Sequence, residues 1–439
     1  MGVQRMAAHI PQSPLVALPY LRYLGPMDHP SPADSAATLD RRFLLGGLAG
    51  AAGVAALAAM AKAGPLAPPA GAVAPTGKTL SDIEPRTAIS TANTPGDADS
   101  LYRITSPGSY YLTDHLLAGP GKSGIEITAS NVTVDLNGFQ IGGFGGLSGV
   151  IATNTALESI TIRNGRIRTL STGVSMVGIP GLTLEALRIE SCLQRGAQLG
   201  IGARVDRCAF VDNGDDGLFC GEGSSVGGST FSGNGGEGLY VNVGASSAAG
   251  KVCDCVAIGN DGTGIRAGGS IVGCVARENG HIGIVASGGA IVADCSATAN
   301  GRAGFYIEQS QAVACAAASN VEAGFIVGFS ARVAGCMAYQ NGVGSASLEA
   351  GGFTISGRFS RIEDCHSTGN LYGYRMTFNA SVNTNILVRN TAGSNSTNWL
   401  IRAGNVCLVV SAASVAADFT GNSGGVSPGS TNPSANYTV

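Results

Sequence analysis

The sequence predicts an all-β solenoid in which each run of about 21 residues forms one coil of three short parallel strands. A frame of Cys, Asn and Gly recurs along the chain, for example as Cys208, Asn213 and Gly217. Within each repeat, apolar and polar residues alternate with the period of two that is typical of strands. Successive framed asparagines lie 19 to 29 residues apart. They are Asn213, Asn234, Asn260, Asn279, Asn300, Asn320, Asn341, Asn370 and Asn395.

The repeat length and the alternation together select one class of repeat protein. Helical repeats are longer and show a period of 3.6, whereas leucine-rich repeats need a Leu-x-x-Leu-x-Leu spacing that is missing here. A coil of three strands fits, with each coil hydrogen-bonded to the next at about 4.8 Å. Like residues then stack on like residues from coil to coil.

Each position of the frame has an expected role in such a stack. The Cys position is a small apolar residue in a dry internal stack, and the Asn amide bonds the next Asn or the turn backbone. The Gly position is expected to permit a tight bend before the next inward-facing residue.

This pattern resembles the right-handed parallel β-helix, or pectin-lyase-like, family from about Leu101 to Leu408. The resemblance implies a right-handed, single-stranded solenoid, for which we expect about ten to twelve coils. The expected organisation is a targeting segment at 1–63, a Pro-rich linker at 64–77, an N-terminal cap with the first coils at 78–130, β-helix repeats at 131–410 and a C-terminal cap or tail at 411–439. A solenoid needs such caps because an open end would pair with another chain.

The N-terminal segment carries the features of an export signal. Arg41 and Arg42 precede an uncharged run from Phe43 to Met60, which ends near a small-x-small site at 61–63. Paired arginines before a weakly hydrophobic run resemble a twin-arginine signal, although Phe43 follows Arg42 directly. A membrane-anchoring helix is the alternative, but 18 residues rich in Gly and Ala are at the short limit for spanning. We therefore expect export with no stable membrane span after cleavage, and a true start at Met27.

Composition excludes several classes of protein. The 439 residues include 67 Gly and only 13% charged residues, and 44% are hydrophobic. Charge is too sparse for a disordered chain, and Gly lacks the strict three-residue period of collagen. A net charge of −3 gives no reason to expect nucleic acid as a partner. No motif indicates a cofactor or a metal, and the sequence does not indicate an oligomeric state.

The eleven cysteines are interpreted as packing residues. Seven of them occupy one position of the frame, where stacked Cβ vectors are parallel and do not give the twist of a disulfide. Free Cys is among the most buried residue types. Disulfides, which are common in exported proteins, are the alternative, and a count of free thiols distinguishes the two.

Candidate catalytic residues emerge when the coils are aligned on the Asn. His281, Arg302 and Glu322 fall in one row, one strand apart, and Asp215, Asp216 and Glu237 form an acidic cluster three coils away. Two facing carboxylates can act as acid and base on a sugar. The Asp215–Asp216 pair resembles a glycosidase pair, but the segment around His281 comes three coils later, too far for one site. The alternative is a solvated row of turns with an Arg302–Glu322 surface pair.

Two functions from different classes are therefore expected. The first is an exported protein that faces polysaccharide, binding it or cleaving it by a lyase-type or glycosidase-type mechanism. The second is a non-catalytic structural or adhesive solenoid of the cell surface. Tyr339 and Tyr372 are candidates for stacking on sugar rings, whereas Tyr374 is expected to point inward. Insertions at 242–250, 343–350 and 376–385 are expected to form loops.

Overall fold

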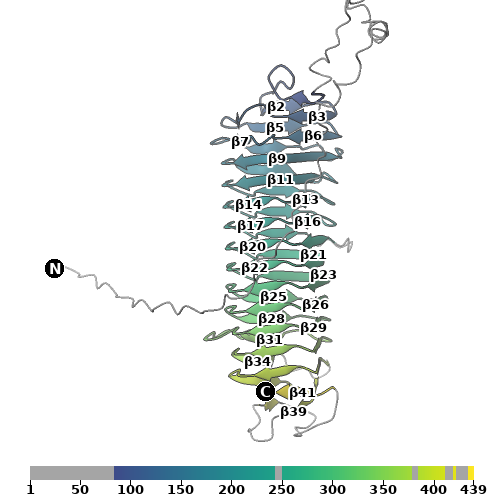
Figure 1. Cartoon of the computed structure of the whole chain (residues 1–439), viewed down its shortest axis with the longest axis vertical. Helices are drawn as coiled ribbons and strands as arrows, with labels where there is room; N and C mark the ends of the chain where they lie inside the picture. Colours follow the sequence, from purple (N-terminus) through teal and green to yellow (C-terminus); the bar gives the residue numbers. More distant parts are fainter. Residues whose placement is uncertain (1–83, 243–249, 378–383, 411–418, 422–433) are drawn as a thin grey trace, which may run out of the picture. The chain divides into compact units, whose positions relative to one another are not determined.

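The computed structural model describes residues 84–242, 250–377, 384–410, 419–421 and 434–439. These residues form strands and turns and no helix, and the strands pair side by side into one continuous parallel sheet that coils on itself. Figure 1 shows the strands stacked one upon another from β2 to β41. The fold is therefore the predicted all-β parallel solenoid, and each full coil contributes one strand to each of three faces.

The first face contains β2 (Ser100–Ile104), β5 (Ser123–Ile127), β8 (Ser148–Ile151), β10 (Thr172–Met176), β12 (Ala197–Leu199), β15 (Leu218–Cys220), β18 (Leu239–Val241), β21 (Ile265–Val272), β23 (Ile284–Ala293), β25 (Ala303–Ile307), β28 (Ala323–Val327), β31 (Gly351–Ile355), β34 (Tyr372–Met376), β37 (Thr397–Ile401) and β40 (Phe419–Gly421). Each strand of this face pairs in parallel with the strand one coil later. The ends of β21 and β23 continue into the second face.

The second face contains β1 (Thr87–Ala88), β3 (Gly108–Tyr111), β6 (Val132–Asp135), β9 (Ile160–Arg168), β11 (Thr183–Glu190), β13 (Arg204–Asp206), β16 (Ser225–Gly227), β19 (Lys251–Cys253), β26 (Gln311–Val313), β29 (Arg332–Ala334), β32 (Arg361–Glu363), β35 (Ile386–Val388) and β38 (Val406–Cys407). The strands β9 and β11 are long enough to turn the corner into the third face.

The third face contains β4 (Leu116–Leu117), β7 (Gln140–Gly142), the ends of β9 and β11, β14 (Ala209–Val211), β17 (Thr230–Ser232), β20 (Val256–Ile258), β22 (Val275–Arg277), β24 (Ser296–Thr298), β27 (Ala316–Ala318), β30 (Met337–Tyr339), β33 (His366–Thr368), β36 (Thr391–Gly393) and β41 (Asn436–Thr438). The short strand β39 (Val409–Val410) also pairs with β41, so the end of the chain folds back into the solenoid.

The number of coils is about 14, more than the ten to twelve expected. The expectation was low because the framed asparagines begin only at Asn213. The coils of β2, β5, β8 and β10 instead stack aliphatic residues such as Ile125, Val150 and Val174 in the core and carry no framed Cys or Asn.

The corner between the third and first faces holds the predicted asparagine ladder. The Nδ2 of Asn300 donates to Oδ1 of Asn320 at 2.9 Å and to the carbonyl of Ala276 at 3.2 Å. The backbone N–H of Asn300 donates to the same Oδ1 at 3.0 Å. Each amide therefore satisfies buried backbone groups and bonds the next amide, which confirms both roles expected of this position.

The framed glycines act differently from the expectation of a tight bend. The left-handed residue of this corner precedes the Asn, as in Asp212 with a φ of 52° and Glu278 with a φ of 57°. A Cβ on Gly217 would lie 2.6 Å from the carbonyl oxygen of Gly238 and 2.8 Å from Nδ2 of Asn234. The framed Gly is therefore required because two coils approach closely there.

The corner between the second and third faces holds the cysteine ladder. The N–H of Cys315 donates to Sγ of Cys336 at 3.4 Å, and the Cys315 thiol donates to the carbonyl of Val313 at 3.3 Å. All eleven cysteines are unpaired, and all except the half-buried Cys253 are buried. The cysteines of this ladder are thus buried free thiols, as interpreted from the sequence, and the structure adds hydrogen bonds that the sequence did not predict.

Aromatic residues fill the core of the last coils. The rings of Phe305, Phe325, Phe353, Tyr374 and Trp399 stack with centroids 4.5 to 5.0 Å apart and nearly parallel planes. Near the end of the chain, Nε1 of Trp399 donates to Oγ1 of Thr438 at 3.0 Å. Strand β41 therefore packs onto the end of this stack.

The expected export signal, the start at Met27 and the Pro-rich linker lie outside the described residues. Among the residues that are described, no helix is long and apolar enough to cross a membrane.

Candidate functional site

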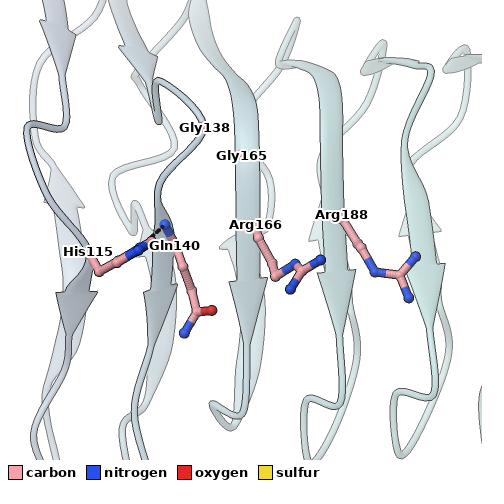
Figure 2. A pocket seen from close by; sticks show the side chains of 6 residues that line it. All are labelled: His115, Gly138, Gln140, Gly165, Arg166 and Arg188. Carbon is pink, nitrogen blue, oxygen red and sulfur yellow. Dashed lines mark hydrogen bonds between the residues drawn. The ribbon is translucent and has the colours of Figure 1, made fainter.

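A cavity of about 290 Å³ lies on the outer surface of the third face, over its first four strands. Inward-facing Ile141, Ile167 and Ile189 align in the register of β7, β9 and β11. The residue before each isoleucine therefore points outward in one row. Figure 2 shows this row, which consists of Gln140, Arg166 and Arg188 on neighbouring strands together with His115, the residue just before β4. Gly138 and Gly165 line the rest of the cavity and contribute no side chains.

The hydrogen bond to His115 fixes the tautomer of its ring. The backbone N–H of Gln140 donates to Nδ1 of His115 at 3.1 Å, so Nδ1 presents a lone pair and the ring proton lies on Nε2. The edge-on ring of Phe139, with a centroid 5.5 Å away, holds the imidazole in place. His115 thus offers Nε2–H as a hydrogen-bond donor in this arrangement.

One carboxylate organises the arginines beside the cavity. Glu190 lies 3.5 Å from Nε of Arg166 and 2.5 Å from Nε of Arg188, and Arg168 is 4.0 Å away. The Glu190 side chain is only 13% exposed, whereas the three arginine side chains are 40 to 47% exposed. One negative charge among three positive charges leaves the site basic, with guanidinium groups that reach solvent.

The structure brings the predicted acidic cluster together on the edge of the first face. Asp216 accepts a hydrogen bond from Nε of Arg195 at 3.0 Å and another from the backbone N–H of Glu237 at 2.9 Å. Nε–H of Arg266 in turn donates a bifurcated hydrogen bond to the two carboxylate oxygens of Glu237, at 2.8 and 3.0 Å. Asp215 is exposed and lies 3.3 Å from Arg195. Each carboxylate therefore has an arginine partner.

The predicted row of His281, Arg302 and Glu322 continues the row of turns that holds the acidic cluster. The N–H of Arg302 donates to the carbonyl of His281, and the N–H of Glu322 donates to the carbonyl of Arg302. Three coil steps, about 14 Å, separate Asp215 from His281. Arg302 pairs with Glu322 at 3.1 Å and with Glu349 at 2.7 Å, while His281 is exposed. The acidic cluster and His281 therefore occupy separate places, as the spacing predicted.

The aromatic candidates differ in exposure. Tyr339 is 44% exposed, and Tyr372 is half-buried beneath the guanidinium of Arg375 at 4.4 Å. Tyr374 is fully buried in the core, as expected. The insertion at 343–350 contributes Glu349, whereas most of the insertion at 242–250 and the centre of that at 376–385 lie outside the described residues.

Sequence reasoning missed the row of the cavity because these coils lack the Cys and Asn frame used for alignment. A weaker signal was present in the segments Gln-Ile-Gly at 140–142, Arg-Ile-Arg at 166–168 and Arg-Ile-Glu at 188–190. Aligning these segments on their isoleucines would have placed Gln140, Arg166 and Arg188 in one outward row.

Comparison with known protein families agrees with this architecture. Residues 104–250 match the family model described as "Right handed beta helix region". The solenoid is a right-handed parallel β-helix. No curated protein matches the chain.

Several solved structures are similar to this β-helix. The A-module of the mannuronan C-5 epimerase AlgE4 from Azotobacter vinelandii is 14% identical with a TM-score of 0.37, over 73% of this chain and 88% of that chain. The ORF18 protein of Geobacillus virus E2 is 13% identical with a TM-score of 0.39, over 63% and 55%. The catalytic domain of a GH87 α-1,3-glucanase in complex with nigerose is 10% identical with a TM-score of 0.37, over 83% and 69%. At these values the alignments assign no site to this chain.

Proposed function

We propose that this β-helix binds an acidic polysaccharide in the cavity of the third face, which we call the basic groove. The observation that carries the proposal is the outward row of His115, Gln140, Arg166 and Arg188, with one polar side chain from each successive coil. The row spans three strand steps, about 14 Å, which is the length of a few linked sugar units. A ligand with a regular repeat can therefore contact the same kind of group on each coil.

The chemistry of the row favours an anionic ligand. The guanidinium groups of Arg166 and Arg188 can bind a carboxylate or sulfate oxygen with two parallel hydrogen bonds. Nε2–H of His115 and the amide of Gln140 suit the hydroxyl and ring oxygens of a sugar. The amide of Gln140 has no side-chain partner among the described residues, so it is available to a ligand.

Binding is supported better than cleavage by the groups on the described surface. The groove has no carboxylate in its lining, and its nearest carboxylate, Glu190, is engaged by arginines. On the first face, Asp216 and Glu237 are engaged by Arg195 and Arg266. A catalytic role for Asp215, Asp216, Glu237, His281, Arg302 and Glu322 stays a prediction, which loss of product formation in Asp216→Asn would support.

The binding proposal is tested with one polymer backbone that carries different substituents. Carboxymethyl-dextran and dextran sulfate should bind the protein, and unmodified dextran should bind much more weakly. The affinity should fall as salt is raised, because salt screens the charges of exposed arginines. Isothermal titration calorimetry at two ionic strengths measures both effects.

Variants of the groove separate specific contacts from general charge. Arg166→Ala should weaken binding of the charged dextrans about tenfold, the effect of losing one charged hydrogen bond of about 1.5 kcal/mol. Arg166→Lys should recover only part of this loss because Lys lacks the planar fork. Arg277→Ala is the matched control, since Arg277 lies on the same face five coils beyond Arg166 and its side chain is 50% exposed. Equal losses in Arg166→Ala and Arg277→Ala would contradict a specific groove.

Export by the twin-arginine route belongs to the same proposal, because a polysaccharide ligand places the protein outside the cytoplasm. Its support is the Arg41–Arg42 pair before the uncharged run. Replacing both arginines with Lys should retain the protein in the cytoplasm, as measured by fractionation of the cells.

A further inference from the structure

A second cavity lies at the corner between the first and second faces, well away from the basic groove. It has a volume of about 170 Å³ and is lined by residues from the coils of β23, β26 and β29. Its polar lining consists of Gln309, Ser310, Gln311, Ser330 and Arg332. We call this cavity the corner pocket.

The corner pocket presents polar groups that the chain itself leaves available. The side chains of Gln309, Gln311 and Ser330 are exposed and have no hydrogen-bond partner among the described residues. Ser310 differs, because its hydroxyl is buried between the carbonyl of Glu308 and the N–H of Ala290. Two amides and one hydroxyl are thus free to bind the hydroxyl groups of a ligand.

A group of arginines adds positive charge beside the corner pocket. Arg332 and Arg361 bind opposite oxygens of the Glu363 carboxylate, with distances from Nε of 2.8 and 2.7 Å, and Arg389 lies 3.3 Å from it. Glu363 is only 5% exposed, whereas the arginine side chains are 42 to 45% exposed. This arrangement resembles that of Glu190 and its three arginines beside the basic groove, except that Arg389 also pairs with Asp364 at 2.7 Å, so two carboxylates face three arginines here.

We propose that the corner pocket is a second binding site for an acidic glycan, so that one protein molecule bridges two polymer chains. The inference rests on the proposed function for the nature of the ligand. Its own support is the free amides of Gln309 and Gln311 beside the exposed guanidinium of Arg332. These groups match sugar hydroxyls and an acidic substituent in the same way as the row in the basic groove.

The positions of the two sites favour bridging over the binding of one straight chain. Six strand steps separate β11 from β26, which is about 29 Å along the solenoid. The basic groove lies on the third face, and the corner pocket lies where the first and second faces meet. A straight glycan lies along one face, so two sites on different faces bind two chains. Two linked sites also raise the avidity for a polymer network without any new contact.

The test measures stoichiometry and bridging separately, with the full-length protein and carboxymethyl-dextran. Calorimetric titration with short oligomers of carboxymethyl-dextran should give two binding sites per molecule of the wild-type protein. Long polymer should give light scattering that rises and then falls as protein is added, because excess protein saturates separate chains. Gln311→Glu places a negative charge in the corner pocket. This variant should bind at one site per protein molecule, and its addition to the long polymer should cause no rise in light scattering. Ser330→Asp should act in the same way, and Asp tolerates the left-handed backbone of Ser330, with its φ of 50°.

The control is Gln198→Glu, which makes the same change in charge on β12 of the first face, outside the lining of both cavities. It should keep two sites and normal scattering. One binding site per wild-type protein molecule, or bridging of polymer by Gln311→Glu, would overturn the proposal of a second site. The proposal of binding in the basic groove would then still stand. Absence of any binding by the wild type would overturn both proposals. Dextran sulfate in place of carboxymethyl-dextran shows whether sulfate or carboxylate is preferred.

Discussion

Replacing Asn300 with Ala tests the hydrogen-bonded ladder that joins the coils. Asn300 lies within the ladder and is fully buried. Its Oδ1 accepts from the N–H of Asn279 at 3.1 Å and from Nδ2 of Asn279 at 3.0 Å. Its Nδ2 donates to Oδ1 of Asn320 and to the carbonyl of Ala276. The substitution removes all four bonds at once.

The expected loss of stability follows from the groups left without partners. The N–H of Asn279 and one N–H of its side-chain amide become unsatisfied buried donors, and each costs about 1–3 kcal/mol. The lost bonds to Asn320 and Ala276 add to this, since their oxygens keep fewer donors. We therefore expect Asn300→Ala to lower the free energy of unfolding by at least the sum for the two donors, about 2–6 kcal/mol.

Chemical denaturation measures this change, and hydrogen exchange locates it. The backbone N–H of Asn279 should exchange faster in Asn300→Ala, because it loses its only side-chain acceptor. The matched control is Ser296→Ala, which removes a polar group from the outer surface of the same coil and should cost less than about 0.5 kcal/mol. A loss in Asn300→Ala no larger than that of the control, with unchanged exchange at Asn279, would refute the role assigned to the ladder.

Two further predictions concern the cysteines and the buried glutamate. Burial raises the pKa of Cys208 to about 11 and that of Cys407 to about 12, so the native protein should react slowly with a thiol reagent at pH 8. After denaturation, the reagent should detect all eleven thiols. Few free thiols in the denatured protein would instead indicate disulfides. Burial by itself raises the pKa of Glu363, but hydrogen bonds from Arg361 and Arg332 outweigh it and hold the pKa below the usual glutamate range. The stability that ionised Glu363 contributes is therefore fully present above the pKa that this group has in the unfolded chain, and it is lost as the pH falls through the pKa in the folded protein. Glu363→Gln should be less stable than the wild type at pH 7 and should lose less stability on acidification. Parallel curves of unfolding free energy against pH for the two proteins would contradict this.

The repeating coils were predictable because their constraint is local and recurs. A buried corner that is filled by Asn in coil after coil, such as the position of Asn260, is visible in the sequence as a regularly spaced Asn. The close approach of two coils at Gly264, where a Cβ would lie 2.7 Å from the carbonyl of Gly283, is visible in the same way as a regularly spaced Gly. The reason for the Gly was missed, since a sequence does not distinguish a residue needed for its φ from one needed for its small size.

The row of the basic groove was harder to predict because outward positions carry no packing constraint. Arg166 and Arg188 become neighbours only when β9 and β11 are in register, and these coils are marked by isoleucines alone. The acidic cluster was placed correctly by its alignment on the Asn, but its partners were not. Arg195 comes from the preceding coil and Arg266 from the following one, and a strand pairing was needed to bring either to its carboxylate.

Charge on a parallel solenoid is constrained by the same stacking that orders its core. Two arginines on neighbouring strands hold like charges about 4.8 Å apart, which costs about 1 kcal/mol in a water-like medium and more near the protein. The solenoid offsets this cost with a carboxylate within each group, the half-buried Glu190 among the arginines of the basic groove and the buried Glu363 among those of the corner pocket. Glu190 faces three arginines, and Glu363 with Asp364 faces three, so each group keeps a net positive charge and its guanidinium groups reach solvent. A polymer with regularly spaced acidic groups would supply the missing negative charge at the arginines beside each of the two cavities.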